Sequence, residues 1–224
     1  MQAAKTADLK RRALRLGVTL NAEAAAQLLR LLDELAQWNR AYSLTAITDP
    51  EAMIAGHLLD SLAASADLAG ARIADLGTGA GFPGLPLAIV HPERQFTLID
   101  GTAKKVRFVA HAARALGLGN VEAVHARAEA LAPDKPFDTI VARAVASLAE
   151  LAALARPLAG PGTLLLAYKG QRPDDELASL PADWELMDVR TVQVPGLAAE
   201  RCLVMLKYRP GAKSGTQTGA QPDA

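Results

Sequence analysis

A glycine-rich segment that begins with an acidic residue is the strongest candidate for a binding site in this chain. It follows an apolar stretch that predicts a strand, precedes one that predicts a helix, and reads Asp75-Leu76-Gly77-Thr78-Gly79-Ala80-Gly81-Phe82-Pro83-Gly84. Glycines let the backbone turn tightly and let a ligand touch the main chain, and the free amides of the next helix point toward that ligand. A glycine turn without a ligand is the simpler alternative.

The spacing of these glycines indicates the ligand. Dinucleotide-binding loops follow G-x-G-x-x-G, but this chain has Phe82 at the third-glycine position and reads G-x-G-x-G. S-adenosylmethionine has no pyrophosphate to cradle, and its ammonium group suits Asp75, either directly or through water. Asp100 ends the next predicted strand, where a carboxylate can accept both ribose hydroxyls. We therefore expect Asp75, Gly79 and Asp100 to bind S-adenosylmethionine.

Two further loops are expected at the same edge of the sheet. One, over residues 125–129, follows the third predicted strand and is expected beside the adenine of the ligand. The other begins at Arg143, after the fourth predicted strand. Ligands of open α/β sheets bind outside the carboxyl ends of the strands, so Arg143 lies where chemistry is expected. A salt bridge to a neighbouring acid is the alternative role for Arg143.

The elements that position these residues fall into two regions. Helical spacing predicts three helices, over 6–16, 22–40 and 51–66, so residues 1–68 are expected to form an N-terminal helical region. Asn21 and Asp49 are the expected N-caps of the second and third helices. Beyond residue 68, strands alternate with helices. Strands are predicted over 72–76, 95–100, 121–125, 137–142 and 162–168, and helices over 84–91, 103–116, 127–131, 147–156 and 173–180.

The order of these elements predicts the fold class. Strands that alternate with helices form a parallel sheet covered on both faces. The last two strands, near 184–194 and 201–208, are joined through Pro195-Gly196, which is too short for a parallel crossover, so they form an antiparallel hairpin. An α/β fold with a mostly parallel sheet, a terminal antiparallel hairpin and an N-terminal helical extension is the plan of Rossmann-like class I methyltransferases. The Rossmann-like domain is expected over 69–208, followed by a disordered tail, 209–224.

The composition limits the class of protein and the cellular compartment that are expected. The 24 basic and 24 acidic residues cancel, which excludes a polycation of the histone type. The single cysteine, Cys202, excludes a disulfide within the chain and favours a reducing, cytoplasmic setting. No apolar run reaches the ~20 residues that span a bilayer, so no membrane association is expected. The histidines have no ligand spacing, so no metal site is expected, and the lack of a heptad seam predicts a monomer.

Several separate motifs, in order, resemble those of the RsmG (GidB) family. They are Trp38-Asn39-Arg40-Ala41-Tyr42-Ser43-Leu44-Thr45, His57-Leu58-Leu59-Asp60-Ser61-Leu62, the glycine loop, Lys104-Lys105-Val106-Arg107-Phe108 and Arg143-Ala144-Val145-Ala146-Ser147-Leu148. The resemblance spans about residues 22–208 and implies a methyltransferase that uses S-adenosylmethionine to methylate N7 of guanine 527 in bacterial 16S rRNA. Its implied partner is 16S rRNA or the small ribosomal subunit. By position, the family implies five donor-binding residues: Gly77, Phe82, Ala128, Glu129 and Arg143.

The chemistry of this reaction suits the residues. Guanine N7 has a free lone pair, so the absence of an obvious acid–base dyad agrees with the assignment. We expect positioning to be the main contribution of the enzyme, with Arg143 as the candidate catalytic residue that supports the donor pocket or orients the substrate. His57, Asp60 and Ser61 either seal the substrate side of that pocket or are structural polar residues. Trp38 lies on an apolar stripe and is expected in the core.

A basic helix is the expected contact with RNA. No acidic residue occurs from Gly101 to Val121, where Lys104, Lys105 and Arg107 are the candidate RNA-binding residues. A solvated helix face is the alternative. Three other functions compete with the family's reaction: an NAD-dependent oxidoreductase, a methyltransferase for another RNA, a protein or a small molecule, and a non-catalytic donor-binding module. Phe82 and the terminal hairpin argue against the oxidoreductase.

Overall fold

The structure, a computed structural model, is built around one seven-stranded sheet. It describes residues 2–143 and 146–211. Residues 212–224, which make up most of the predicted disordered tail, and positions 144–145 of the motif after Arg143 lie outside the described residues. The strands are β1 (Arg72–Leu76), β2 (Gln95–Asp100), β3 (Val121–His125), β4 (Phe137–Arg143), β5 (Ala159–Lys169), β6 (Trp184–Val192) and β7 (Arg201–Tyr208).

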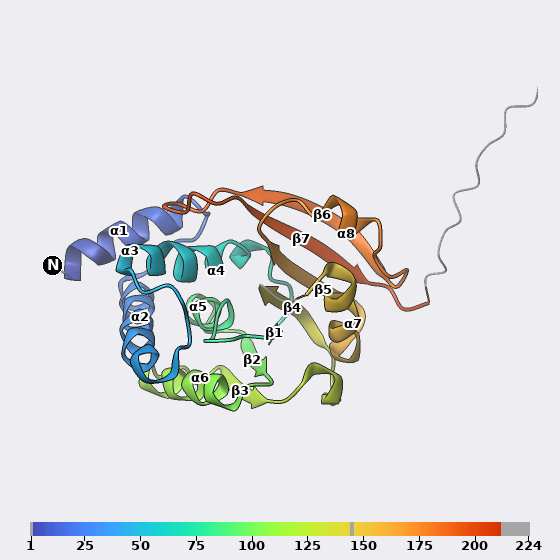
Figure 1. Cartoon of the computed structure of the whole chain (residues 1–224), viewed down its shortest axis with the longest axis horizontal. Coiled ribbons are helices and arrows are strands. Elements are labelled where there is room, and N and C mark those ends of the chain that lie inside the picture. The colour runs from blue at the N-terminus through green and yellow to red at the C-terminus, as the bar shows by residue number, and fades with distance from the viewer. Residues whose placement is uncertain (1, 144–145, 212–224) are drawn as a thin grey trace, which may run out of the picture.

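The sheet confirms the predicted fold class. Its strand order is β3-β2-β1-β4-β5-β7-β6 (Figure 1). The first five strands are parallel, whereas β7 runs antiparallel to both β5 and β6 and forms the predicted hairpin with β6. The strand order reverses between β1 and β4, which is the point where open α/β sheets bind ligands.

The N-terminal region is helical, but its third helix is not the regular one predicted over 51–66. The region comprises α1 (Gln2–Leu14), α2 (Ala22–Tyr42), α3 (Pro50–Met53), the π-helix η1 (Ile54–Leu59), α4 (Asp60–Leu62) and the 3-10 turn η2 (Ser65–Asp67). Asn21 and Asp49 cap α2 and α3 as predicted, each accepting a backbone N–H with its side chain. Wider π-turns are common at functional sites, and η1 carries His57.

Helices and short turns connect the strands. They are α5 (Gly84–Val90), α6 (Ala103–Ala115), η3 (Ala128–Ala130), α7 (Leu148–Ala155), η4 (Arg156–Leu158) and α8 (Asp174–Leu177). Two predicted helices are much shorter in the structure: 127–131 is the 3-10 turn η3, and 173–180 contracts to α8. Strand β5 begins three residues before its predicted start. A capping box between Ser147 and Glu150 fixes the start of α7.

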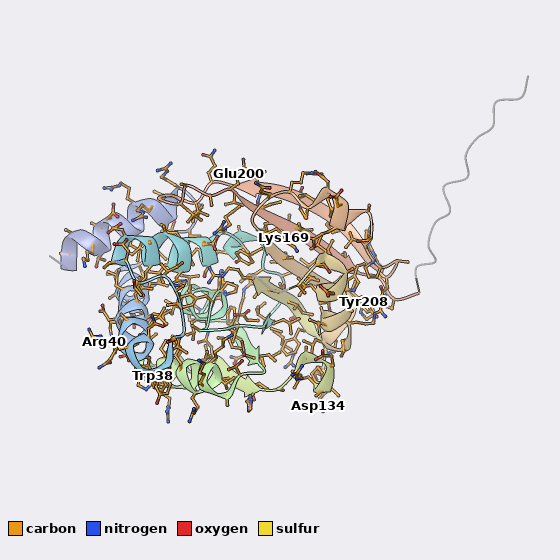
Figure 2. The ribbon with its side chains drawn as sticks, in the orientation of Figure 1. Trp38, Arg40, Asp134, Lys169, Glu200 and Tyr208 are labelled. Atoms are coloured by element: carbon orange, nitrogen blue, oxygen red, sulfur yellow. The ribbon has the colours of Figure 1, made fainter. Side chains whose placement is uncertain are left out.

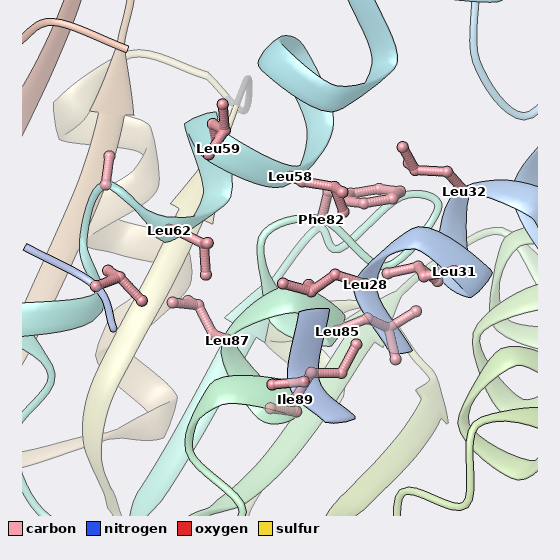
Figure 3. Close-up of a cluster of buried hydrophobic side chains, with 14 of the residues drawn as sticks. Leu28, Leu31, Leu32, Leu58, Leu59, Leu62, Phe82, Leu85, Leu87 and Ile89 are labelled. Atoms are coloured by element: carbon pink, nitrogen blue, oxygen red, sulfur yellow. The ribbon is translucent and has the colours of Figure 1, made fainter. Parts of the chain in front are cut away.

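Successive side chains of each strand point to opposite faces of the sheet and pack into two hydrophobic cores, one on each face. Ile73 and Leu98 point to one face and share a cluster with α1, α2, α5 and α6, whereas Ala74 and Ile99 point to the other face and pack with α7. Figure 3 shows part of the first cluster, where leucines of α2 meet Leu58 of η1, Phe82 and the leucines of α5. The N-terminal helices are therefore packed into the same core as the sheet. Within the described residues, no helix is long and apolar enough to span a bilayer.

Candidate active site

The carboxyl ends of the parallel strands bring the predicted site residues to one edge of the sheet. The glycine loop leaves β1 directly after Leu76, and the backbone amides of Gly77 and Thr78 both donate to the Ile99 carbonyl of β2, at 2.9 and 3.0 Å. Asp100 ends β2 one residue later, and Arg143 ends β4 on the other side of β1. The start of the loop is therefore hydrogen-bonded to β2 and lies between β2 and β4, which end in Asp100 and Arg143.

Asp75 holds the glycine loop from inside the protein. Its fully buried carboxylate accepts hydrogen bonds through Oδ2 from the Thr78 hydroxyl at 2.6 Å and from the Gly84 amide at 2.7 Å. Burial raises the pKa of Asp75 to about 6, although both hydrogen bonds oppose the shift. Among the described residues, its Oδ1 is buried without a hydrogen-bond partner. Oδ1 is therefore the oxygen that is left for the predicted contact with an ammonium group, direct or through water, and this contact remains a prediction.

The loop needs glycine for two different reasons. Gly77, Gly79 and Gly81 have φ values of +71°, +61° and +85°, a region that residues with a side chain rarely adopt. A Cβ at Gly79 would meet only the Gly77 carbonyl, 4.0 Å away, so the space over Gly79 is open to a ligand. A Cβ at Gly84 would lie 2.6 Å from Asp75 Oδ2. Gly79 thus leaves room for a ligand, and Gly84 lets α5 approach the carboxylate.

Asp100 faces the loop from β2, as predicted. Its Oδ2 accepts the Gly79 amide at 3.0 Å, and its Oδ1 accepts the Thr102 amide at 2.8 Å. The Lys105 ammonium lies 3.6 Å from Oδ2. Because an ionised carboxylate has about four acceptor sites, Asp100 keeps acceptor capacity for ribose hydroxyls while it braces the loop.

The loop after β3 reaches the same edge. His125 pairs with Asp100 in the sheet register, and its ring Nε2 lies 3.1 Å from the Gly101 carbonyl. The turn η3 follows, with Ala128 buried and Glu129 exposed. Both residues thus follow the strand beside Asp100, where the family's adenine contact is expected.

An aromatic ring joins the glycine loop to the N-terminal helices. The His57 imidazole stacks on Phe82 with ring centroids 4.7 Å apart, and the Arg143 guanidinium carbon lies 5.7 Å from the Phe82 centroid. The His57 Nε2 lies 3.0 Å from the Thr45 hydroxyl. Burial, helped by the nearby Arg143 charge, lowers the pKa of His57 to about 4, so the ring is neutral at pH 7.

Arg143 forms a salt bridge with Asp60, which agrees with the alternative role considered for it in the sequence. Its Nη1 donates to Asp60 Oδ2 at 2.9 Å and to the Gly56 carbonyl at 2.8 Å. Ser61 is likewise bonded within the protein, since its hydroxyl donates to the His57 carbonyl at 2.5 Å. These contacts favour the structural role for Asp60 and Ser61. They also place Arg143 between the N-terminal helices and the glycine loop.

Two groups that hold Asp60 and Arg143 in place were not predicted from the sequence. Arg201 on β7 donates from Nε to Asp60 Oδ1 at 2.9 Å, and the Gly56 carbonyl accepts from Arg143. Gly56 carried a signal, because a glycine inside a predicted helix often marks a local irregularity. Arg201 carried none, because 141 residues separate it from Asp60.

The candidate RNA-binding residues lie on α6, two of them in contact with Asp100 at the end of β2 and with the end of α2. Lys105 lies beside Asp100, Lys104 donates to the Tyr42 carbonyl at 3.0 Å, and Arg107 is exposed. Figure 2 shows Trp38 near the end of α2 next to α6, and its ring packs against Phe108 at the edge of the core, where it is half-buried and not fully buried as expected. Across the described residues, no group of three His, Cys, Asp or Glu side chains is placed to hold a metal ion.

Comparison with known proteins identifies the family. The model of the GidB family, described as rRNA small subunit methyltransferase G, matches residues 24–204. A ribosomal RNA small subunit methyltransferase G from Xanthomonas axonopodis pv. citri is 48% identical over 189 residues, which cover 84% of this chain and 89% of that protein. A protein of the same name from Methylococcus capsulatus is 49% identical over 199 residues, covering 89% of this chain and 97% of that protein.

Solved structures agree on the fold. TrmN from Thermus thermophilus superposes with a TM-score of 0.54 at 24% identity, covering 77% of this chain and 52% of that chain. A SAM-dependent methyltransferase from Aquifex aeolicus gives a TM-score of 0.52 at 21% identity, covering 71% and 94%. At these identities, the likeness shows the class I methyltransferase fold alone. The sequence relatives carry the assignment: this chain belongs to the rRNA small subunit methyltransferase G (GidB) family, whose members are S-adenosylmethionine-dependent ribosomal RNA methyltransferases.

Proposed function

We propose that this protein transfers the methyl group of S-adenosylmethionine to N7 of guanine 527 in 16S rRNA. The observation that carries the proposal is the geometry of the loop in a member of this family: Asp75 closes it from inside, Asp100 braces it from β2, and the space over Gly79 is open. The order of the family motifs along the chain supports the choice of nucleotide and atom. The proposal places the protein in the cytoplasm as a monomer acting on 16S rRNA or the small subunit.

The residues present fit the donor. The open space over Gly79 leaves room for its aminoacyl end, Gly77 lets the loop turn at a φ of +71°, and Asp100 and the turn of Ala128 and Glu129 suit its ribose and adenine. S-adenosylmethionine, when bound, supplies an electrophilic methyl group. The buried Asp75 Oδ1 matches the ammonium group of such a ligand, because a buried oxygen without a partner gains most from a positive hydrogen-bond donor.

The protein's contribution to the reaction is positioning. Guanine N7 needs no deprotonation, and His57, which stacks on Phe82, is a weak base because its pKa is lowered to about 4. Arg143 is fixed by two hydrogen bonds beside the Phe82 ring, so it supports the donor pocket or orients the base without exchanging a proton. Fixed geometry of this kind lowers the entropic barrier to methyl transfer.

The substrate side of the site is basic. Lys104, Lys105 and Arg107 occupy the first turns of α6, which begins three residues after Asp100. Their placement next to the donor loop suits an RNA backbone entering at this edge. A methyltransferase for another RNA or for a small molecule is the second candidate. Mapping of the methylated nucleotide distinguishes the two candidates.

Nucleotide mapping in a deletion strain tests the proposal. Ribosomal RNA from a strain that lacks the chromosomal enzyme is compared with rRNA from the same strain carrying this chain or its Arg143→Ala variant. The proposal expects 7-methylguanosine at position 527 with the wild-type chain and a marked loss with the variant. Methylation at another nucleotide, or none in 16S rRNA, contradicts it.

A further inference from the structure

A buried carboxylate joins the N-terminal helices, the parallel sheet and the terminal hairpin at the donor site. Asp60 is 2% exposed, and each of its oxygens accepts one guanidinium: Oδ2 from Arg143 of β4 and Oδ1 from Arg201 of β7, both at 2.9 Å. We infer that Asp60 and Arg201 are positioning residues that hold Arg143 in its working orientation. The inference rests on the proposed role of Arg143 in the donor pocket.

The π-turn supplies the other anchor of Arg143. In an α-helix, the Asp60 amide would donate to the Gly56 carbonyl, four residues earlier. Here, the Asp60 amide donates instead to the carbonyls of Ala55 and His57, and the Gly56 carbonyl accepts Arg143 Nη1. Both anchors of Arg143 therefore come from one irregular turn, and both bind the same nitrogen. The remaining guanidinium lies beside the Phe82 ring.

Arg201 acts on Arg143 only by way of Asp60. Among the described residues, the hydrogen bonds of its side chain go from Nε to Asp60 Oδ1 and from Nη1 to the Glu200 carbonyl, both at 2.9 Å. A carboxylate held by one guanidinium can still turn about its Cβ–Cγ bond, whereas a second guanidinium on the other oxygen fixes its plane. Loss of Arg201 therefore loosens Asp60, and Arg143 with it. A displacement of about 1 Å at a positioning group is enough to cost up to about 100-fold in rate.

The chain contains a matched control for this network. Arg190 of β6 pairs with Asp67 of η2 at 2.5 Å, so it also ties the terminal hairpin to the N-terminal region. The Asp67 carboxylate is bonded to Arg190 and not to Arg143. An Arg190→Met variant therefore removes a comparable ion pair between the same two regions, while it leaves the Asp60 network in place.

The test compares Arg201→Met, Arg201→Lys and Arg190→Met in the full-length chain. The readouts are the Kd for S-adenosylhomocysteine by calorimetry, the unfolding midpoint in urea, and kcat and KM for methyl transfer to small subunits. We expect Arg201→Met to weaken S-adenosylhomocysteine binding and to lower kcat, each by about tenfold, Arg201→Lys to recover most of both losses, and Arg190→Met to change neither. Arg201→Met combined with Arg143→Ala should be no worse than Arg143→Ala alone, because both act through one group.

Two results overturn the inference: equal kinetics and ligand affinity for Arg201→Met and Arg190→Met, or additive losses in the Arg143→Ala background. The proposed function fails separately, when the wild-type chain transfers no methyl group to guanine 527. In that event, the calorimetric comparison still decides whether Arg201 positions Arg143, because it needs no RNA substrate.

Discussion

Replacement of Asp75 by asparagine is predicted to make the fold progressively more stable relative to the wild type as the pH rises, while it weakens donor binding. Asparagine has nearly the same shape, and its side-chain carbonyl can accept the hydrogen bonds that Thr78 and Gly84 now give to Oδ2. The amide nitrogen then replaces the unpartnered Oδ1. The substitution removes a buried negative charge, but it also buries an amide nitrogen where the described residues offer no acceptor, at a cost of about 1–3 kcal/mol that does not depend on pH.

The pKa of Asp75 sets the size of the effect. Burial raises this pKa from 3.8 to about 6, a difference of about 2 units. At about 1.4 kcal/mol per unit, ionised Asp75 lowers the free energy of unfolding by roughly 3 kcal/mol relative to its protonated form. A raised carboxyl pKa favours the native state below pH 3.8, and this advantage is lost as the pH rises through about 6.

Urea denaturation of both proteins between pH 4 and 8 measures this difference. We expect the difference in the free energy of unfolding between the Asp75→Asn variant and the wild type to shift by about 3 kcal/mol in favour of the variant between pH 4 and pH 8. His57 titrates in the opposite sense, because its pKa is lowered to about 4 and protonation below pH 6.5 opposes folding. Both proteins keep His57, so its contribution cancels in the comparison.

Two further measurements complete the test of Asp75. Asp138 also accepts two backbone amides, from Ala71 and Arg72 at the start of β1, but it is exposed, so Asp138→Asn should give no stability gain at pH 8. The Asp75→Asn variant should bind S-adenosylhomocysteine about tenfold more weakly, the range expected for a charged hydrogen bond. A stability difference between the two proteins that stays constant from pH 4 to pH 8 would contradict the raised pKa of Asp75.

Three other predictions follow from contacts in the site. Arg143→Ala should raise the donor KM or lower kcat by at least tenfold in steady-state assays, and full activity with an unaltered donor KM would remove Arg143 from the mechanism. Gly84→Ala should cost about 1–3 kcal/mol in urea denaturation, because its Cβ would lie 2.6 Å from Asp75 Oδ2, whereas Gly119→Ala, with nothing within 4 Å, should be nearly neutral. Arg107→Glu should weaken RNA binding and reduce its salt dependence by about one ion or more, while unchanged affinity across a salt series would exclude the basic face of α6.

The fold and the donor loop could be predicted because their signals are local. Short apolar runs predicted β1 and β2, and the acid and glycines between residues 75 and 84 predicted the turn that follows β1. The spacer of Pro195-Gly196 was enough to predict the hairpin of β6 and β7, since so short a connection admits no crossover.

The features that were missed depend on long-range packing. The apolar spacing of residues 51–66 fits an α-helix and a π-turn equally well, so η1 could not be distinguished. The pairing of Arg201 with Asp60 joins strands and helices far apart in the chain and leaves no local pattern. Asp75 was predicted as a ligand contact, and the structure adds its role inside the loop, which depends on how closely α5 packs at Gly84.

A crystal structure of the protein with S-adenosylhomocysteine tests the central claim most directly. We expect electron density for the ligand at the carboxyl ends of β1 and β2, with its amino acid over Gly79, its ribose hydroxyls on Asp100 and its adenine beside Ala128. Density at another surface, or an empty edge under saturating ligand, would show that the glycine loop does not bind the donor.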